Sequence, residues 1–254
     1  MSREFPYRDL VFELVRRELR VRYRRSFIGF SWTMLQPLLM MTVFHVAFSS
    51  IFRFEVDNYP VYVLAGLLFW NFFSQSILGS MSSLRANSRL IQKLPVPKSV
   101  FPLSVVISGI VNLTSALLPL FVILVVTGHP LRPSLLFLPV SVAIAALFTL
   151  GVGLLLAPLA VFFSDIVELA MVTLQLLMFM TPIMYPMSIV PPRWHWLVRF
   201  NPVRSILEVF RDPIYYGKVP PLSHLSVAVG LALIAFTLGV ICFRRLAGKL
   251  TFYL

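Results

Sequence analysis

Long stretches without a charged side chain alternate with short, strongly basic segments along this chain of 254 residues. A helix needs about 20 apolar residues to cross the hydrocarbon core of a membrane. Such stretches occur six times, at residues 26–52, 58–84, 99–131, 133–164, 169–192 and 219–243. The pattern predicts an all-α integral membrane protein with a single domain over 1–254, in which a surface helix within 1–25 precedes six spans within 26–254.

Composition supports the membrane class, because 58% of the residues are hydrophobic, 13% are charged and the mean hydropathy is +0.86. The net charge of +12 comes from 22 basic and 10 acidic residues. Of the basic residues, 15 lie in the N-terminal segment, in the segment 84–102 or in the C-terminal tail. Cytoplasmic loops carry such an excess, so we predict that both termini and this loop are cytoplasmic, and we expect no nucleic-acid partner.

Motifs for catalysis or nucleotide binding are missing from the sequence, and its single cysteine, Cys242, excludes an internal disulfide. Ion-coupled transport usually requires acidic side chains inside the membrane. Asp165 and Glu168 are the only acids near a span interior, and both lie at the start of the predicted fifth span. We therefore expect no enzyme activity and no metal or cofactor bound by this chain, and any pumping needs energy from another polypeptide.

Two basic segments suit the membrane surface. Residues 10–25 predict an amphipathic helix along the cytoplasmic interface, with a charged side that includes Arg16, Arg17, Arg20 and Arg24. Such a helix can meet lipid, a protein partner or both, and orientation of the chain is the simpler use of its arginines.

The loop between the second and third predicted spans also reads as a short helix, which proline residues end. It has cations at helical spacing and apolar residues on another side: Arg85, Arg89 and Lys93, with Leu90, Ile91 and Leu94. Docking of a partner and an inert loop both fit this pattern.

The segment 191–221, between the fifth and sixth predicted spans, is rich in aromatic residues and prolines. Trp194 and Trp196 fit an aromatic belt at the external interface. Residues 203–210 have a helical pattern but are too few to span. This layout predicts short external helices that dip into the membrane, where their backbone must be covered by protein.

Four motifs in the right order resemble the permease subunits of ABC exporters for cell-surface polysaccharides, the ABC-2 class that exports O-antigen, capsule and teichoic acid. They lie within residues 22–52, 87–104, 164–186 and 201–212. Val96 stands where the family often has an aromatic residue, and Ser164 stands where it commonly has arginine. The likeness covers almost the whole chain.

This resemblance implies an interface helix over 10–25, a coupling helix over 85–94 that docks on an ATPase, and external gate helices within 191–217. The gate residues would include Trp194, Trp196, Asn201 and Pro202. It also implies a homodimer in the bacterial cytoplasmic membrane with two copies of an ABC ATPase, which binds ATP and magnesium. The substrate would be a glycan on an undecaprenyl-diphosphate carrier, whose diphosphate the arginines of the interface helix could receive.

Aromatic faces stack on sugar rings, which suggests a translocation path along the second span. The candidate path residues are Tyr62, Trp70, Asn71 and Phe73. Ordinary helix packing stays the favoured explanation for any one of these aromatic residues. Two other functions stay open, namely an ABC permease for a small lipid, drug or antibiotic, and an ion-driven carrier or channel.

Overall fold

The computed structural model describes residues 7–23, 29–48, 56–93 and 96–253, and all secondary structure in these ranges is helical. This confirms the predicted all-α class. The α-helices are α1 (Tyr7–Tyr23), α2 (Trp32–Val46), α3 (Tyr59–Ala86), α4 (Ser88–Lys93), α5 (Val100–Val126), α6 (Leu138–Phe162), α7 (Asp165–Met180), α8 (His195–Arg199), α9 (Pro202–Arg211), α10 (Leu222–Ala247) and α11 (Leu250–Tyr253). Short 3-10 or π-helical turns join them at η1 (Gly29–Ser31), η3 (Pro133–Phe137), η4 (Met187–Ile189), η5 (Pro192–Trp194) and η6 (Asp212–Tyr216).

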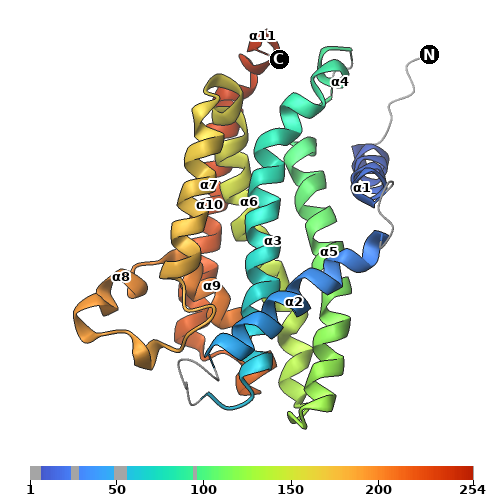
Figure 1. The fold of residues 1–254 in the computed structure, drawn as a ribbon. Helices are drawn as coiled ribbons and strands as arrows, with labels where there is room; N and C mark the ends of the chain where they lie inside the picture. Colours follow the sequence, from blue (N-terminus) through green and yellow to red (C-terminus); the bar gives the residue numbers. More distant parts are fainter. Residues whose placement is uncertain (1–6, 24–28, 49–55, 94–95, 254) are drawn as a thin grey trace.

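Helix α3 is the centre of an elongated bundle and packs against α2, α5, α6, α7 and α9 (Figure 1). Its side chains Val61, Leu64 and Phe69 have no exposed surface. Within the described ranges, four helical segments are long and apolar enough to cross a membrane: Tyr59–Ala86, Val100–Val126, Pro133–Phe162 and Leu222–Ala247. These agree with the predicted second, third, fourth and sixth spans.

Helices α2 and α7 occupy the predicted first and fifth spans but have only 15 and 16 residues. At 1.5 Å per residue, each reaches roughly 22–24 Å, which is shorter than a hydrocarbon core of about 30 Å. The predicted bounds of the fifth span are wrong, because α7 begins earlier and ends at Met180. Pro182 and Pro186 explain this early end, since proline cannot continue a helix. Part of the predicted first span lies outside the described residues, and the count of six spans stays a prediction.

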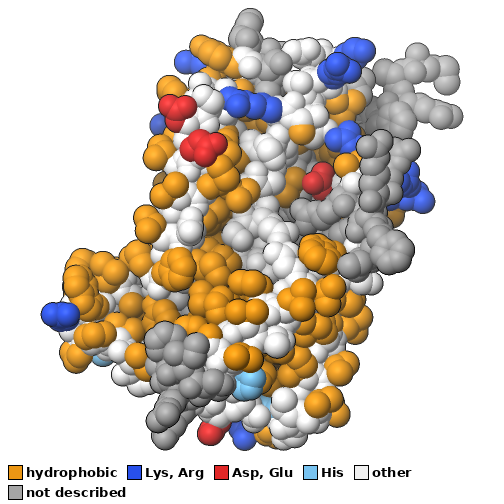
Figure 2. All heavy atoms as spheres, viewed as in Figure 1, with side chains coloured by type: hydrophobic (Ala, Val, Ile, Leu, Met, Phe, Trp, Pro, Cys, Tyr) orange, Lys and Arg blue, Asp and Glu red, His pale blue; other side chains and the backbone are white. Residues whose placement is uncertain are grey.

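Helix α11 lies at the same end of the bundle as α4, and α1 lies in the half of the bundle toward that end (Figure 1). The turn between α5 and α6 lies at the opposite end, beside η6 (Figure 1). Basic side chains gather around the end that carries α4, whereas apolar side chains cover the middle and lower parts of the visible face (Figure 2). This distribution matches the separation that the sequence predicts between a basic surface and a lipid-covered region.

Helix α6 packs most extensively against α10. Two glycines allow this close approach, because a Cβ atom added to Gly239 would lie 2.2 Å from the carbonyl oxygen of Gly151. Small residues are enriched at such contacts in membranes, where close backbone approach improves van der Waals packing.

Two apolar clusters hold the helices together. The first surrounds α3 and is rich in aromatic residues from α3, α6 and α9. The second lies at the end of the bundle near α4 and joins residues from both ends of the chain: Leu14, Leu84, Ile91, Val100, Phe101, Leu154, Ala157, Val161, Phe243 and Leu250. We call this second cluster the basal core.

Candidate functional site

Helix α4 is a six-residue helix between the two long helices α3 and α5. The expectation of one continuous helix over 85–94 is wrong, because α3 extends to Ala86 and the chain turns at Asn87 before α4 begins. Arg85 therefore belongs to α3, where its guanidinium donates to the carbonyl oxygen of Val161, 3.2 Å away. Arg89 and Lys93 belong to α4 and are both exposed.

The apolar residues of α4 divide between the protein interior and its surface. Ile91 is 6% exposed and packs in the basal core, whereas Leu90 is half-buried at its edge. Leu94 lies outside the described residues. Of the three apolar residues predicted to contact a partner, only Leu90 is partly available in the described part of the helix, because Ile91 already packs against its own chain.

Helix α1 packs against α5 beside the basal core, into which it inserts Leu14. Arg16, Arg17 and Arg20 are exposed, as an amphipathic surface helix requires, and Arg24 lies outside the described residues. Arg17 donates to the side-chain oxygen of Asn87 at 2.5 Å. This bond connects the predicted interface helix to the turn that precedes α4.

Two cations hold the helix ends that surround the basal core. Besides the bond from Arg85, the Lys98 ammonium donates to the carbonyl oxygen of Ala247 at 2.6 Å. Carbonyl groups in the last turn of a helix lack intrahelical partners, and basic side chains satisfy them. Burial lowers the pKa of Lys98. Part of the positive charge of this surface thus fastens α6 and α10 and is not free for a partner.

At the opposite end, Asn201 and Pro202 start helix α9. The Asn201 side chain accepts from the backbone N–H of Val203 at 3.0 Å and donates to the hydroxyl of Thr181 at 2.8 Å. Proline in the first turn lacks only an N–H that would have no helical partner. Trp194 and Trp196 lie on the neighbouring segment and are about half exposed, at 48% and 55%.

The sequence interpretation missed a buried arginine at the end of α9. Arg211 is 3% exposed, and its guanidinium donates to the carbonyl oxygens of Pro182 at 2.8 Å and Ile183 at 3.1 Å. It also lies 3.9 Å from the ring centroid of Tyr62 on α3. Arg211 therefore joins three elements: α9, the chain just after α7, and α3. An ionisable pair, Arg211 and Asp212, inside a mainly apolar segment was the signal that could have found it.

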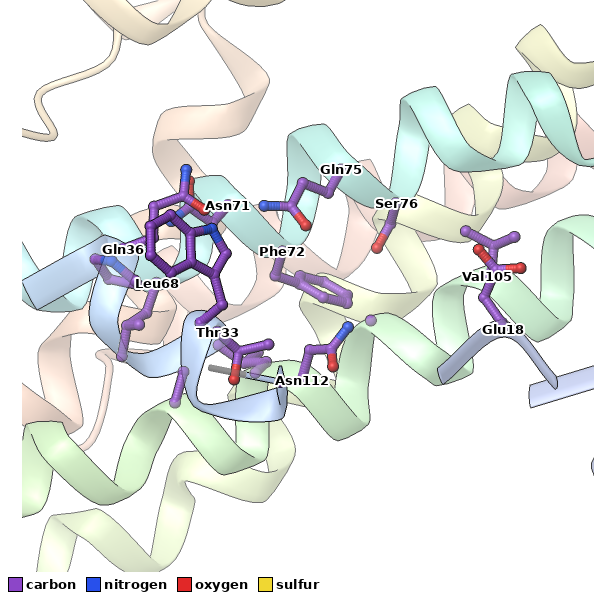
Figure 3. A pocket seen from close by; sticks show the side chains of 16 residues that line it. Glu18, Thr33, Gln36, Leu68, Asn71, Phe72, Gln75, Ser76, Val105 and Asn112 are labelled. Atoms are coloured by element: carbon purple, nitrogen blue, oxygen red, sulfur yellow. The ribbon is translucent and has the colours of Figure 1, made fainter. Parts of the chain in front are cut away.

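A groove of about 190 Å³ lies between α1, α2, α3 and α5, and it contains an unusual number of uncharged polar side chains (Figure 3). The polar residues that line it are Glu18, Thr33, Gln36, Asn71, Gln75, Ser76 and Asn112. Trp32, Phe72 and Gly109 also line it. We call it the polar groove.

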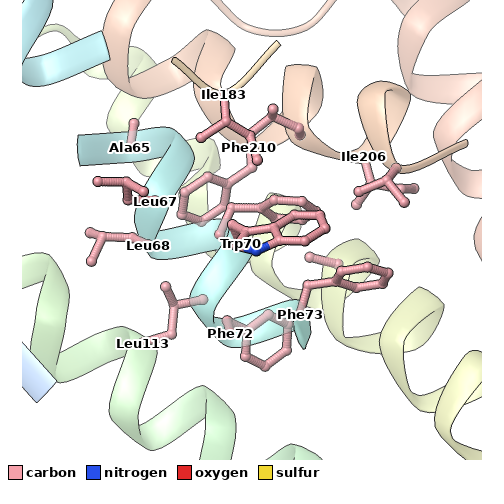
Figure 4. Packing of buried hydrophobic residues seen from close by; sticks show 14 of the residues in the cluster. Ala65, Leu67, Leu68, Trp70, Phe72, Phe73, Leu113, Ile183, Ile206 and Phe210 are labelled. Atoms are coloured by element: carbon pink, nitrogen blue, oxygen red, sulfur yellow. The ribbon is translucent and has the colours of Figure 1, made fainter. Parts of the chain in front are cut away.

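The structure separates the four candidate path residues. Tyr62, Trp70 and Phe73 are at most 5% exposed, and Trp70 and Phe73 pack within the first cluster near Phe210 (Figure 4). Asn71 instead lines the polar groove. In the described chain, these aromatic residues of α3 therefore serve packing. Asn71, the residue next to Trp70, lies on the side of α3 that faces the polar groove.

An all-α bundle with several apolar spans, and with a short helix between two of them at one end, has the architecture of a membrane transport subunit. The chain belongs to the ABC-2 type transporter family, whose model matches residues 9–215. This confirms the resemblance that the sequence motifs indicated, and it places the chain among transport subunits and not among enzymes.

Individual relatives match over nearly the whole chain. An O-antigen export system permease protein RfbA of Myxococcus xanthus is 32% identical over 91% of this chain and 89% of its own length. A protein of the same name from Klebsiella pneumoniae is 29% identical over 94% and 92%. The polysialic acid transport protein KpsM of Escherichia coli is 20% identical over 90% of each chain.

Proposed function

We propose that this chain is the membrane-spanning subunit of an ATP-driven exporter for a lipid-linked cell-surface polysaccharide. The observation that carries the proposal is the similarity to O-antigen export permeases over about nine-tenths of both chains. The carrier lipid would be undecaprenyl diphosphate. The protein would cross the bacterial cytoplasmic membrane six times and keep both termini in the cytoplasm.

The working complex would be a homodimer with two copies of a separate ABC ATPase, which binds ATP and magnesium. The end of the bundle that carries α4 is the proposed docking surface. Its support is physical: the exposed Arg89 and Lys93 and the half-buried Leu90 lie on a helix that is held by the basal core. A force on α4 would pass directly to α3 and α5.

The exposed arginines of α1 are the proposed contact for the diphosphate of the carrier. These arginines include Arg16, Arg17 and Arg20. Each guanidinium group can donate two parallel hydrogen bonds to two oxygens of one phosphate group. Arg24, outside the described residues, is proposed for the same contact. The external gate would be formed by the segment that carries Trp194, Trp196, Asn201 and Pro202.

The proposal is tested in cells from which this chain is removed and then restored. We expect their surface polysaccharide, measured by carbohydrate-stained gels of the cell envelope, to fall at least tenfold without the chain and to return with it. Unchanged surface polysaccharide would overturn the proposal.

Purified protein distinguishes the two alternatives. If the chain is a permease for a small lipid, drug or antibiotic, such a compound should stimulate ATP hydrolysis by the reconstituted complex, and a lipid-linked glycan should not. An ion-driven carrier or channel would show gradient-driven flux with no nucleotide and no ATPase present.

A further inference from the structure

The polar groove lies at the middle depth of the bundle, where uncharged polar groups are costly. It follows α3 from Leu68 to Ser76, near the midpoint of that helix. The eight helical rises between these residues, at 1.5 Å each, make this wall about 12 Å long. Polar side chains within membrane helices usually bond across helices or mark a substrate pathway.

The chemistry of the lining is that of a site for hydroxyl groups. Side chains of asparagine and glutamine each offer donors and an acceptor, and α2, α3 and α5 all contribute them or hydroxyls: Thr33, Gln36, Asn71, Gln75, Ser76 and Asn112. Among the residues that the structure describes, the lining has one charged side chain, Glu18, and no basic one. A carboxylate repels phosphate, so the lining suits a neutral ligand better than the diphosphate of a lipid carrier.

One group in the groove is buried and needs a partner. The hydroxyl of Ser76 belongs to a residue that is 2% exposed, and it makes no hydrogen bond within the described part of the chain. Gly109 of α5 lies directly against it, because a Cβ atom there would lie 2.4 Å from the Ser76 oxygen. A buried hydroxyl without a partner is unfavourable, and a bound hydroxyl would reach it only if α5 moved away from this contact.

Aromatic surface completes the site. Trp32 lines the groove and is 46% exposed, and Phe72 lines it from α3. A sugar ring has an apolar face that packs on such rings and hydroxyls that bond to amides. The groove volume of about 190 Å³ corresponds to roughly six water molecules, which restricts the occupant to a small unit.

We propose that the polar groove between α2, α3 and α5 binds a neutral sugar unit. This inference rests on the proposed function and moves the sugar contact from the buried aromatic side of α3 to its amide side. Asn71 and Gln75 of α3 and Asn112 of α5 hold the hydroxyls, and Trp32 covers the ring.

Cysteine labelling in membranes that contain the full complex tests whether the groove is wet. In a Cys242→Ser background, Asn112→Cys should react with a water-soluble methanethiosulfonate at least tenfold faster than Val122→Cys. Val122 is the matched control on α5. Its side chain is 61% exposed on the outer surface of the described bundle, where lipid and not water would surround it. Equal rates would overturn the inference.

Sugar binding is tested with two detergents of equal tail length. Octyl glucoside should slow the labelling of Asn112→Cys at least threefold, whereas tetraethylene glycol monooctyl ether, which has no sugar, should leave it unchanged. Equal protection by both would mean that only the tail binds, and it would refute the proposal. If Asn112→Cys is protected from labelling without detergent, and only when the dimer forms, a second copy of this chain occupies the groove and the sugar proposal is wrong.

Export connects the site to transport. The double variant Asn71→Leu/Gln75→Leu should lower surface polysaccharide at least tenfold at unchanged membrane abundance, and Thr114→Val, an exposed polar site on α5, should not. If the double variant exports normally while cells without the chain lose their polysaccharide, the groove inference fails and the proposed function stands. If cells without the chain keep their polysaccharide, the proposed function fails whatever the labelling shows.

Discussion

Replacement of Arg211 by methionine removes the charged centre that joins α9 to the chain after α7 and to α3. The guanidinium makes two hydrogen bonds to carbonyl oxygens and contacts the face of the Tyr62 ring. Hydrogen bonds to charged groups contribute about 1.5–3 kcal/mol each, and a desolvated cation–π contact adds about 2 kcal/mol. Release of the buried charge offsets part of this loss. A net destabilisation of roughly 3 kcal/mol follows.

The assay is thermal unfolding of the purified protein in detergent, followed by fluorescence-detected size-exclusion chromatography. A domain of about this size loses roughly 2–4 °C of Tm per kcal/mol, so Arg211→Met should melt roughly 6–12 °C below wild type. Arg211→Lys should fall between the two, because one ammonium cannot reproduce the fixed fork that spans both carbonyl oxygens.

Arg204 provides a matched control on the same helix. It pairs with Glu208 at 2.7 Å, but both side chains are partly exposed. Exposed or partly exposed pairs contribute at most about 1 kcal/mol, so Arg204→Met should change Tm by no more than about 4 °C. If Arg211→Met melts within about 2 °C of wild type, the assignment of Arg211 as the joint of this region is wrong.

Three further predictions concern other parts of the chain. Gly239→Leu should force α10 away from Gly151 and lower the Tm by at least about 6 °C, whereas Gly230→Leu on the same helix, with no atom within 4 Å of an added Cβ, should not. Leu90→Glu should reduce copurification of the ATPase at least fivefold with membrane insertion intact, whereas Gln92→Glu should not. Burial raises the pKa of Asp212, so the folded state favours its protonated form. Wild type is therefore stabilised at low pH and loses this contribution as pH rises through the folded pKa, and Asp212→Asn should gain Tm over wild type above that pKa but not below 3.8.

Each of these has an outcome that contradicts it. Equal melting of the two glycine variants would show that α6 and α10 separate at no cost. Full recovery of the ATPase with Leu90→Glu would remove the described face of α4 from the docking surface. A constant Tm difference between Asp212→Asn and wild type from pH 3 to pH 8 would exclude an effect of ionisation.

The long spans were predictable because length and apolar composition alone determine them. The charge-free stretches locate α3, α5, α6 and α10 to within a few residues at each end, and Pro182 ends α7 by its missing N–H. The division of 85–94 between two helices was not predictable, since helical spacing continues through Asn87. At the break, the Asn87 side chain accepts from Arg17 and donates to the carbonyl oxygen of Ser83.

The candidate site was only partly predictable for a related reason. Aromatic residues at positions 62, 70 and 73 indicate sugar contacts as well as they indicate packing, and only burial distinguishes these uses. The groove combines residues from α2, α3 and α5 that are far apart in the sequence. The role of Arg211 likewise depends on hydrogen bonds to carbonyl groups almost thirty positions away, which sequence spacing does not reveal.

The basal core has a consequence for synthesis. Leu250 has no exposed surface and shares this core with Leu14, so nearly the whole chain separates two of its members. Contacts between such distant residues form late, because the intervening chain must be ordered first. The surface that carries α4 is therefore completed only after Leu250 has left the ribosome. The surface proposed for docking of the ATPase would therefore stay unfinished while the chain is being translated.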